Sequence, residues 1–447
     1  MTRDDLKQMQ SQPLERKILM TKQRIMEWVN HFGEDGVYVS FSGGKDSTVL
    51  LDIAREVYPN IEAVFVNTGL EYPEIVNFVK QHDNVTIIRP KITFREVICK
   101  YGYPMFSKET SECVSGARKY LTSIMQDETA LTDRQTDRQT DRQTDRISIG
   151  TTELQDKACM QSLKTMTRGG STTSSVNYVA LANILNDRMK NRRGGANQRL
   201  AIMLGMLTTD QKIKANIPEK DRSLFSQEKY KFMLEAPFEV SNKCCNVMKK
   251  EPAHRFAKQT GKMPITGQMA SESRLRQQVW MKHGCNGFNN THPISNPMSF
   301  WQEQDCLQYI YEKKLPIASV YGDVVIDYAA MGQTEGQLSF FSEQPIYMTT
   351  GCWRTGCFAC MYGAHKDKPC DCNMTKTMEF SNPKLVDWEL RGGHFREDGM
   401  WEPKGGLGYW FVLEYCRIHG GLNYYIPNRE YYLKKYMTEE TKRYLYG

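Results

Sequence analysis

Residues 37–47 read VYVSFSGGKDS, and this stretch decides the fold class. Its first half is short, β-branched and aromatic, which is typical of a buried strand. After the two glycines, residues 48–58 read TVLLDIAREVY, with the apolar spacing of a helix. Where a strand turns into a helix, free backbone N–H groups and the positive end of the helix dipole converge. The stretch therefore predicts an anion-binding loop between a strand and a helix.

The residue types of this loop suit a phosphate. Gly43 and Gly44 let the backbone approach the ligand closely, and Lys45 adds a positive charge. Ser42 and Ser47 offer hydroxyl groups. The spacing is not that of the Walker loop, GxxxxGK[ST], so kinase or GTPase chemistry is not implied. The alternative is a Gly-Gly turn with a purely structural role.

Similar strand signals recur along the chain. IEAVFVNTG (61–69) and NVTIIRP (84–90) read as strands, with a helix beginning near Pro73 between them, and MPITG (263–267) reads as a later strand. Strands that alternate with helices of this length predict an α/β fold with a parallel sheet.

Composition sets the broad class. The 447 residues include 40% hydrophobic and 11% aromatic residues, enough to bury real cores, and the net charge is +7. No apolar run approaches the roughly 18 residues of a membrane-spanning helix, and the first residues, MTRDDLKQMQSQ, are polar. We expect a soluble, cytoplasmic protein with no membrane partner.

Residues 132–146 read TDRQTDRQTDRQTDR, a repeat of four residues without an apolar member. Nothing in it can pack, so we predict a solvated, flexible insertion. The codons ACA GAC AGA CAG spell Thr-Asp-Arg-Gln, so a pure ACAG repeat would encode the tract. We therefore hypothesise that the gene is phase-variable; mixed synonymous codons would refute this, and a neutral linker expansion is the alternative.

The sequence resembles the phosphoadenosine phosphosulfate reductase family within the PP-loop ATP pyrophosphatases. The resemblance begins with SGGKDS, with NTG (67–69) and with ITGQMASESRLR (265–276). It extends over about 35–125 and 228–372, through YGYPMFSKE, CCNVMKKEP, GCNGF, SNPMSFW and GCWRTGCFACMYG. It implies an adenine nucleotide alpha-hydrolase-like sheet, and a loop that holds the terminal phosphates of ATP or the matching groups of an adenylyl-sulfate substrate.

The resemblance also assigns roles to residues. It implies that the SGGKDS loop binds phosphate, that Asp46 assists Mg2+, and that Asn67 and Thr68 line the nucleoside pocket, as the switch-point rule for parallel sheets also suggests. Around the phosphates it places Glu272, Ser273, Arg274 and Arg276. Arg274 is favoured, because a guanidinium suits a pair of phosphate oxygens; with Lys45 and Asp46 it forms the predicted catalytic set. A solvated helix face is the alternative for ESRLR.

Seven of the thirteen cysteines gather at 244–245 and 352–372, which suggests metal or redox chemistry in a reducing compartment. A CxxC pair and an adjacent pair elsewhere can supply four thiolates to one metal site. The predicted ligands are Cys244, Cys245, Cys357 and Cys360, with Cys285 and Cys352 as alternates. In the adenylyl-sulfate reductase branch this order holds a 4Fe-4S cluster, so the resemblance favours iron-sulfur; zinc and free thiols stay open.

Three functions compete. The first is ATP pyrophosphatase-type adenylation coupled to sulfur transfer, with a sulfur-donor protein and a DNA or RNA acceptor as partners. The second is a reductase of adenylyl sulfate or phosphoadenylyl sulfate that makes sulfite. In such reductases a cysteine in a C-terminal ECGxH-like segment attacks sulfur; this sequence shows none, and Cys416 is the late candidate. The third is a non-catalytic nucleotide sensor or nucleic-acid binder that uses the arginines of 188–199.

The predicted domain division has five parts. They are an N-terminal helix (1–33), the two parts of the nucleotide-binding domain (34–125 and 228–330), a flexible low-complexity insertion (126–227), and a cysteine-rich metal-binding loop with the C-terminal region (331–447).

Overall fold

The structure is a computed structural model that describes residues 1–136, 198–205, 227–332, 345–358, 360–362, 382–422, 424 and 426–447. The described chain forms two compact units. Unit 1 comprises 1–94, 245–359 and 370–377, and unit 2 comprises 95–244, 360–369 and 378–447. Residues 95–125, which the sequence placed in the nucleotide-binding domain, thus belong to unit 2.

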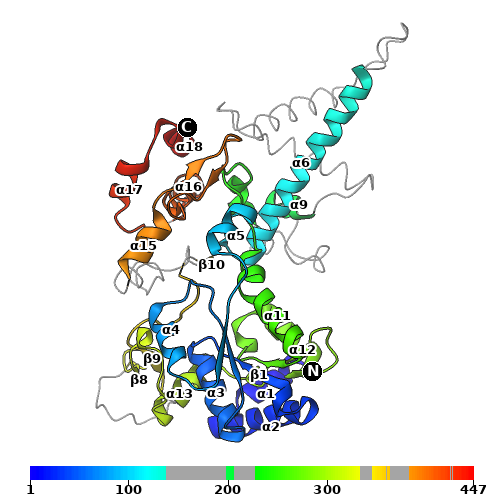
Figure 1. The fold of residues 1–447 in the computed structure, drawn as a ribbon, viewed down its shortest axis with the longest axis vertical. Helices are drawn as coiled ribbons and strands as arrows, with labels where there is room; N and C mark the ends of the chain where they lie inside the picture. The colour runs from blue at the N-terminus through cyan, green and yellow to red at the C-terminus, as the bar shows by residue number, and fades with distance from the viewer. Residues whose placement is uncertain are drawn as a thin grey trace. The chain divides into compact units, whose positions relative to one another are not determined.

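Unit 1 is built on a six-stranded sheet with the order β3-β2-β1-β5-β7-β6 (Figure 1). Its strands are β1 (Val37–Ser40), β2 (Ala63–Val66), β3 (Val85–Ile88), β5 (Met263–Ile265), β6 (Asn286–Gly287) and β7 (Ile294–Ser295). All neighbours pair in parallel except β6 with β7. The predicted α/β fold with a parallel sheet is confirmed. A separate antiparallel pair joins β8 (Val324–Ile326) to β9 (Tyr347–Thr349).

The helices of unit 1 cover this sheet. They are α1 (Arg3–Gln10), α2 (Leu14–Phe32), η1 (Glu34–Gly36), α3 (Lys45–Val57), α4 (Pro73–Lys80), η4 (Asn246–Lys250), α11 (Glu251–Thr260), η5 (Ala270–Glu272), α12 (Arg274–His283), α13 (Glu303–Lys313) and η6 (Ser319–Tyr321). Helix α3 packs against β1, α2 and α13, and α11 packs against β3. Val49, Leu50 and Ile53 of α3 are fully buried, so the apolar face of the predicted helix anchors the phosphate loop.

One element near the N-terminus differs from its prediction. The single helix expected before Gly33 is two helices, α1 and α2, which separate at Ser11–Pro13. Pro13 has no N–H group and precedes the first residue of α2, so it starts a helix better than it continues one. Lys17 of α2 then donates to both carboxylate oxygens of Asp305 in α13 at 2.7 Å.

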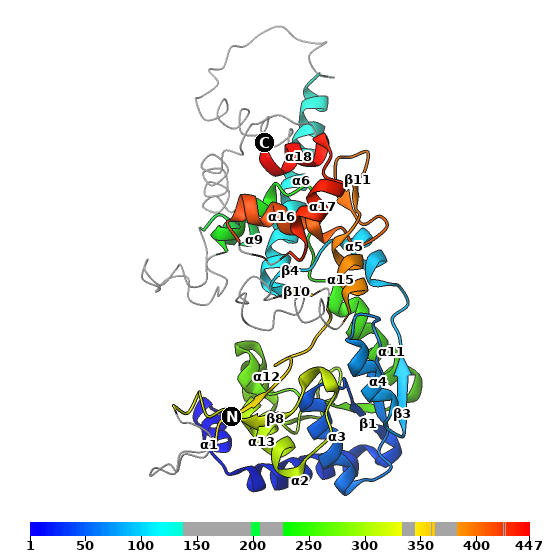
Figure 2. The same ribbon diagram turned by 90° about the vertical axis from the view of Figure 1, so that its left-hand side faces the viewer.

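Unit 2 is mainly helical. Its helices are α5 (Phe94–Tyr101), α6 (Lys108–Thr136), α9 (Gln198–Met203), η3 (Glu228–Leu234), α15 (Pro383–Leu390), α16 (Tyr409–Gly420), α17 (Arg429–Tyr436) and α18 (Glu439–Tyr446). The first residue of α5, Phe94, still belongs to unit 1. Helix α16 is the buried centre of the C-terminal group, with α17 and α18 packed against it (Figure 2). Strands β4 (Met105–Phe106) and β10 (Met361–Tyr362) pair in parallel, and β11 (His394–Phe395) pairs antiparallel with β12 (Trp401–Glu402).

The first part of the predicted insertion continues a helix. The backbone of α6 runs through residues 126–136, so the first TDRQ unit is helical, while the bounds and the flexibility of the insertion stay a prediction. A helix satisfies its backbone hydrogen bonds internally and needs no apolar face to form them. The rest of the repeat and most of 137–226 lie outside the described residues, as do four of the basic residues in 188–199.

Candidate functional site

The phosphate loop joins the end of β1 to the start of α3 within unit 1. Gly44 is the residue before the first turn of α3, and Gly43 has φ +71°. A Cβ on Gly43 would lie 2.8 Å from methyl carbons of both Ile75 and Val79 in α4. The positive φ and the close approach both require glycine at this position.

The two serines of the loop bind each other. The Ser47 hydroxyl accepts from the Ser42 N–H at 3.1 Å, lies 3.0 Å from the Ser42 hydroxyl and donates to the Gly44 carbonyl at 3.0 Å. These bonds, with a 3.4 Å bond from the Gly44 N–H to the Ser42 hydroxyl, hold the turn closed at the N-terminus of α3. That arrangement is the one that binds anions at helix N-termini.

Lys45 is held by two groups from distant segments. Its Nζ donates to the Trp353 carbonyl at 2.6 Å and to Glu303 Oε1 at 3.1 Å, and it lies 5.6 Å from the ring centroid of Tyr321. The Lys45 side chain is buried, whereas Glu303 is about half exposed. The loop therefore has its cation in place, fixed between a carboxylate and a carbonyl.

Asp46 is buried and interacts electrostatically with an arginine. Burial raises the pKa of its carboxyl, while Lys45, a hydrogen bond from the Cys306 thiol and Arg276 act to lower the pKa. Burial lowers the pKa of Arg276, and Asp46 opposes that change. The structure thus brings together two predicted site residues, Asp46 and Arg276, that are far apart in the sequence.

The segment 272–276 forms the start of α12. The Ser273 hydroxyl accepts from the Arg276 N–H at 3.3 Å and caps the helix, and Glu272 forms an ion pair with Arg276. Arg274 is the first residue of α12, and its side chain lies outside the described set. Arg276 is therefore the basic residue of this segment that the structure relates to the phosphate loop.

Asn67 and Thr68 occupy the turn after β2. The Thr68 hydroxyl donates to the Glu71 carboxylate at 2.8 Å, and the Asn67 side chain accepts from the Gly69 N–H at 3.0 Å. Strands β1, β2 and β5 are parallel, so this turn lies at the same sheet edge as the phosphate loop. In parallel sheets ligands bind at this edge.

In unit 1, two predicted metal ligands interact electrostatically. Cys357 interacts with Cys245 and accepts a hydrogen bond from Lys249, and its neighbour Phe358 donates from its N–H to the Leu70 carbonyl at 2.8 Å. Burial raises the pKa of the Cys357 thiol, and Lys249 opposes this. The charge of Cys357 in turn raises the pKa of Lys249. Lys249 belongs to η4, a π-helical turn of a kind that often occurs at functional sites.

The other predicted ligands have different surroundings. Cys244 and Cys360 both influence the hydroxyl of Tyr409 in unit 2, where Tyr409 is fully buried. Cys285 is buried beside Trp280, and the buried Cys352 thiol donates to the Arg354 carbonyl at 2.7 Å. Among the described residues, no three or more His, Cys, Asp or Glu side chains form a group able to hold a metal ion. The four-cysteine ligand set stays a prediction.

Cys416 does not suit the role of nucleophile. It is fully buried in α16, its thiol lies 3.9 Å from the sulfur of Met233, and burial raises its pKa. The thiolate is the reactive form of cysteine, and an apolar, closed environment disfavours it.

Sequence reasoning missed four residues of the site. They are Lys249, Glu303, Tyr321 and the carbonyl of Trp353. The segments CCNVMKKEP, SNPMSFW and GCWRTGC, quoted above, contain or adjoin three of them, but no local pattern says that they meet Lys45 or Cys357. Tyr321 is buried, and its hydroxyl is hydrogen-bonded to Thr355, so it links the loop to the cysteine segment.

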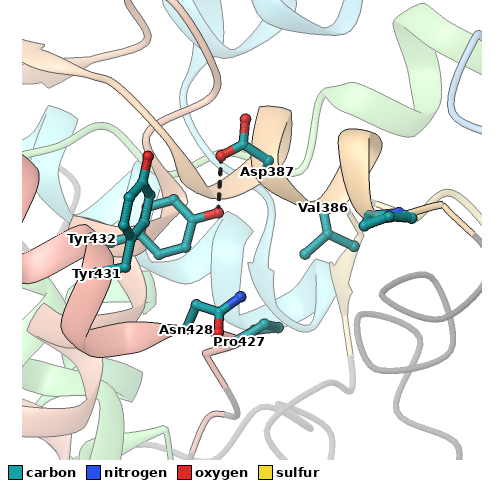
Figure 3. Close-up of a pocket in the computed structure, with 7 residues that line it drawn as sticks. Val386, Asp387, Pro427, Asn428, Tyr431 and Tyr432 are labelled. Carbon is teal, nitrogen blue, oxygen red and sulfur yellow. Dashed lines mark hydrogen bonds between the residues drawn. The ribbon is translucent and has the colours of Figure 1, made fainter.

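A surface pocket of about 390 Å³ lies elsewhere, in unit 2 (Figure 3). Residues from α15 and from the start of α17 line it, and Tyr432 donates to Asp387 at 3.1 Å across it. Asp387 also accepts from Arg391 at 3.0 Å. Its hydroxyl and carboxylate groups already have hydrogen-bond partners, and it contains none of the predicted site residues. In addition, no helix among the described residues is both long and apolar enough to cross a membrane.

Comparison with known proteins agrees with the phosphate-loop architecture. The family model of the phosphoadenosine phosphosulfate reductase domain matches residues 36–147 and 191–360. An adenosine 5'-phosphosulfate reductase of Staphylococcus haemolyticus is 27% identical over 95 residues, 20% of this chain and 39% of the relative. Another, of Oceanobacillus iheyensis, is 25% identical over 116 residues, 24% of this chain and 46% of the relative.

A third relative is an uncharacterized protein of Methanocaldococcus jannaschii, 38% identical over 73 residues, 15% of this chain and 18% of the relative. The chain spans less than half the length of each of these three relatives.

Proposed function

Because the chain belongs to the phosphoadenosine phosphosulfate reductase domain family, we propose that unit 1 binds an adenine nucleotide and performs ATP pyrophosphatase-type adenylation coupled to sulfur transfer. The family match covers more than half of the chain and confirms the resemblance indicated by SGGKDS, NTG and ITGQMASESRLR. A nucleotide-binding function follows at the level of the family. The specific reaction, adenylation coupled to sulfur transfer, is what we propose.

The phosphate loop supports this proposal. Backbone N–H groups at the start of α3, together with Lys45, would stabilise the negative charge that develops on a departing pyrophosphate. Arg276, which pairs with Glu272, also interacts electrostatically with Asp46 and would add positive charge on that side of the loop. The carboxylates of Asp46 and Glu303 would contact a bound Mg2+, and the ion would neutralise phosphate charge.

The observation that favours adenylation over reduction is the state of the thiols nearest the loop. Cys306 is fully buried and donates to Asp46, and Cys352 is buried and donates to the Arg354 carbonyl. Burial also raises the pKa of Cys306. A sulfonucleotide reductase needs an accessible thiolate to attack sulfur. These enclosed thiols do not supply one.

Reduction of adenylyl sulfate or phosphoadenylyl sulfate to sulfite is the second candidate. Its support is that two of the relatives reported above are adenosine 5'-phosphosulfate reductases. Cys357 would be the thiol to examine first, because Lys249 favours its thiolate. A non-catalytic nucleotide sensor would keep the loop and lack both reactions.

The proposal retains a metal centre on Cys244, Cys245, Cys357 and Cys360. Thiolates hold 4Fe-4S clusters and zinc, so this donor set fits either group. Cys245 and Cys357 interact within unit 1, and Lys249 beside them would offset the negative charge of thiolate ligands. A bound cluster would hold or pass sulfur from a donor protein, in the cytoplasm, to a nucleic acid or a thiol-bearing acceptor.

The test is calorimetric titration of anaerobically purified protein with ATP and Mg2+, with adenylyl sulfate and with phosphoadenylyl sulfate. We expect the protein to bind ATP more tightly than either sulfonucleotide, and we expect Lys45→Ala to abolish ATP binding. Lys22→Ala is the matched control, because Lys22 pairs with Glu56 on the surface of unit 1 and does not contact the loop. Tight sulfonucleotide binding with weak ATP binding would refute adenylation and favour the reductase.

A further inference from the structure

Trp353 is a large aromatic side chain exposed beside the phosphate loop. Its side chain is 44% exposed, while its carbonyl accepts the 2.6 Å hydrogen bond from Lys45. Folded proteins usually bury much of a tryptophan, so an exposed indole fixed at a ligand site is informative.

The segment around Trp353 is fixed on both sides. The Cys352 N–H donates to the Val320 carbonyl at 2.9 Å, and the Thr355 hydroxyl is hydrogen-bonded to Tyr321. Cys352 and Tyr321 are almost fully buried. The backbone is therefore tied down before and after Trp353, while the indole itself remains accessible.

Arg354 lies against this indole. Its guanidinium carbon is 4.9 Å from the ring centroid of Trp353, within the range of a cation–π contact. Glu303 is the carboxylate that shares Lys45 with the Trp353 carbonyl. An aromatic plane and a guanidinium are thus joined, through the Lys45 hydrogen bond to Trp353, to the anion-binding loop of unit 1.

We propose that Trp353 and Arg354 form a platform that binds an unpaired base of a single-stranded nucleic acid, the acceptor of the proposed transfer reaction. This inference rests on the proposed function, because it names the acceptor class for the same site. Bases stack on exposed aromatic rings without strong sequence preference, and arginine contributes stacking and phosphate contacts. The indole would stack on the base, and the guanidinium would contact the adjoining phosphate.

The position of Trp353 argues against a role in binding the adenine of the nucleotide. The Lys45 contact places Trp353 at the phosphate end of the site. The predicted nucleoside residues, Asn67 and Thr68, belong to the turn after β2. A base stacked on Trp353 would therefore lie next to the phosphates and outside the predicted nucleoside pocket.

The experiment is fluorescence anisotropy of the full chain with labelled single-stranded DNA and RNA of mixed sequence, at fixed low salt. We expect Trp353→Ala to weaken binding roughly tenfold and Trp353→Phe to retain most of it, since stacking needs a ring. Arg354→Ala should weaken binding and reduce its salt dependence.

Tyr431→Ala is the matched control. Tyr431 is 48% exposed and also carries a cation over its ring, Lys435 at 5.0 Å, but it belongs to unit 2. Oligonucleotide affinity unchanged in Trp353→Ala, or lowered equally in Tyr431→Ala, would overturn the inference. A parallel calorimetric titration with ATP and Mg2+ separates the two proposals. Loss of ATP affinity in Trp353→Ala would overturn this inference in favour of adenine stacking, whereas absence of ATP binding in the unaltered protein would refute the proposed function.

Discussion

Glu389 in α15 is a buried carboxyl whose neutralisation should stabilise unit 2. Its side chain is fully buried, and neither of its oxygens has a hydrogen-bond partner among the described residues. Burial alone raises its pKa from 4.5 to about 8. The folded state therefore keeps a proton that the unfolded state releases at neutral pH. Stability should fall as pH rises from about 4.5 to about 8, and change little above that.

The size of the effect follows from the two pKa values. Each pKa unit corresponds to about 1.4 kcal/mol, so keeping Glu389 buried costs about 3 kcal/mol at pH 7 and about 5 kcal/mol above pH 9. Glu389→Gln keeps the shape and removes the titration. We expect the variant to gain stability over the natural protein progressively between pH 5 and pH 8. A constant packing difference would not change with pH.

The assay is hydrogen exchange of the α16 amides, which reports the opening of unit 2 separately from unit 1. Glu414 is the control, because it is equally buried but binds Arg417 and Arg429. Burial acts to raise the pKa of Glu414, but hydrogen bonds from the two arginines lower it. Glu414→Gln should therefore destabilise unit 2 by roughly 2 kcal/mol at neutral pH. A stability difference for Glu389→Gln that is the same at pH 5 and pH 8 would refute the reasoning.

Three further predictions concern unit 1. Gly43→Ala should destabilise it by roughly 1–3 kcal/mol and abolish ATP binding in calorimetry, because of the positive φ and the 2.8 Å contacts. Gly33→Ala is the control, since Gly33 also has a positive φ but a Cβ there would have no atom within 4 Å. It should lower the stability of unit 1 less and leave ATP binding intact. Lys17→Ala should cost about 3 kcal/mol in urea unfolding by removing the cation that pairs with the Asp305 carboxylate, which keeps its hydrogen bond from the Gln302 N–H, and adding Asp305→Asn should recover part of that loss. Cys245→Ser should lower the iron or zinc content of anaerobically purified protein, measured by elemental analysis, while Cys285→Ser should not; equal loss in both would contradict the ligand set.

The sequence allowed the phosphate loop to be predicted because every signal for it is local. Strand, glycine turn and helix follow one another within 37–57, and the structure places β1 and α3 there. The residues that hold Lys45 could not be predicted in this way. Glu303 and Trp353 are 258 and 308 positions away from Lys45, and only the packing of α3 against α13 and the course of the 352–358 segment bring them to it.

The cysteines show the same limit. Adjacent and CxxC spacings predict that thiols can meet, and Cys245 does interact with Cys357. Spacing does not show that Lys249 would join them, since its position depends on the π-helical turn η4. Nor does it separate Cys285, which packs beside Trp280, from the predicted ligands.

The contacts of Lys45 connect the nucleotide site to the proposed acceptor platform. A lysine ammonium group has three N–H donors, and contacts with Trp353 and Glu303 account for two of them. The third can bind a phosphate oxygen while the Trp353 carbonyl stays bound. The same ammonium would then hold the departing phosphates and fix the segment that carries Trp353 and Arg354. Because one cation serves both groups, loss of Lys45 should weaken nucleotide binding and also release the acceptor platform, which no substitution in that platform would do.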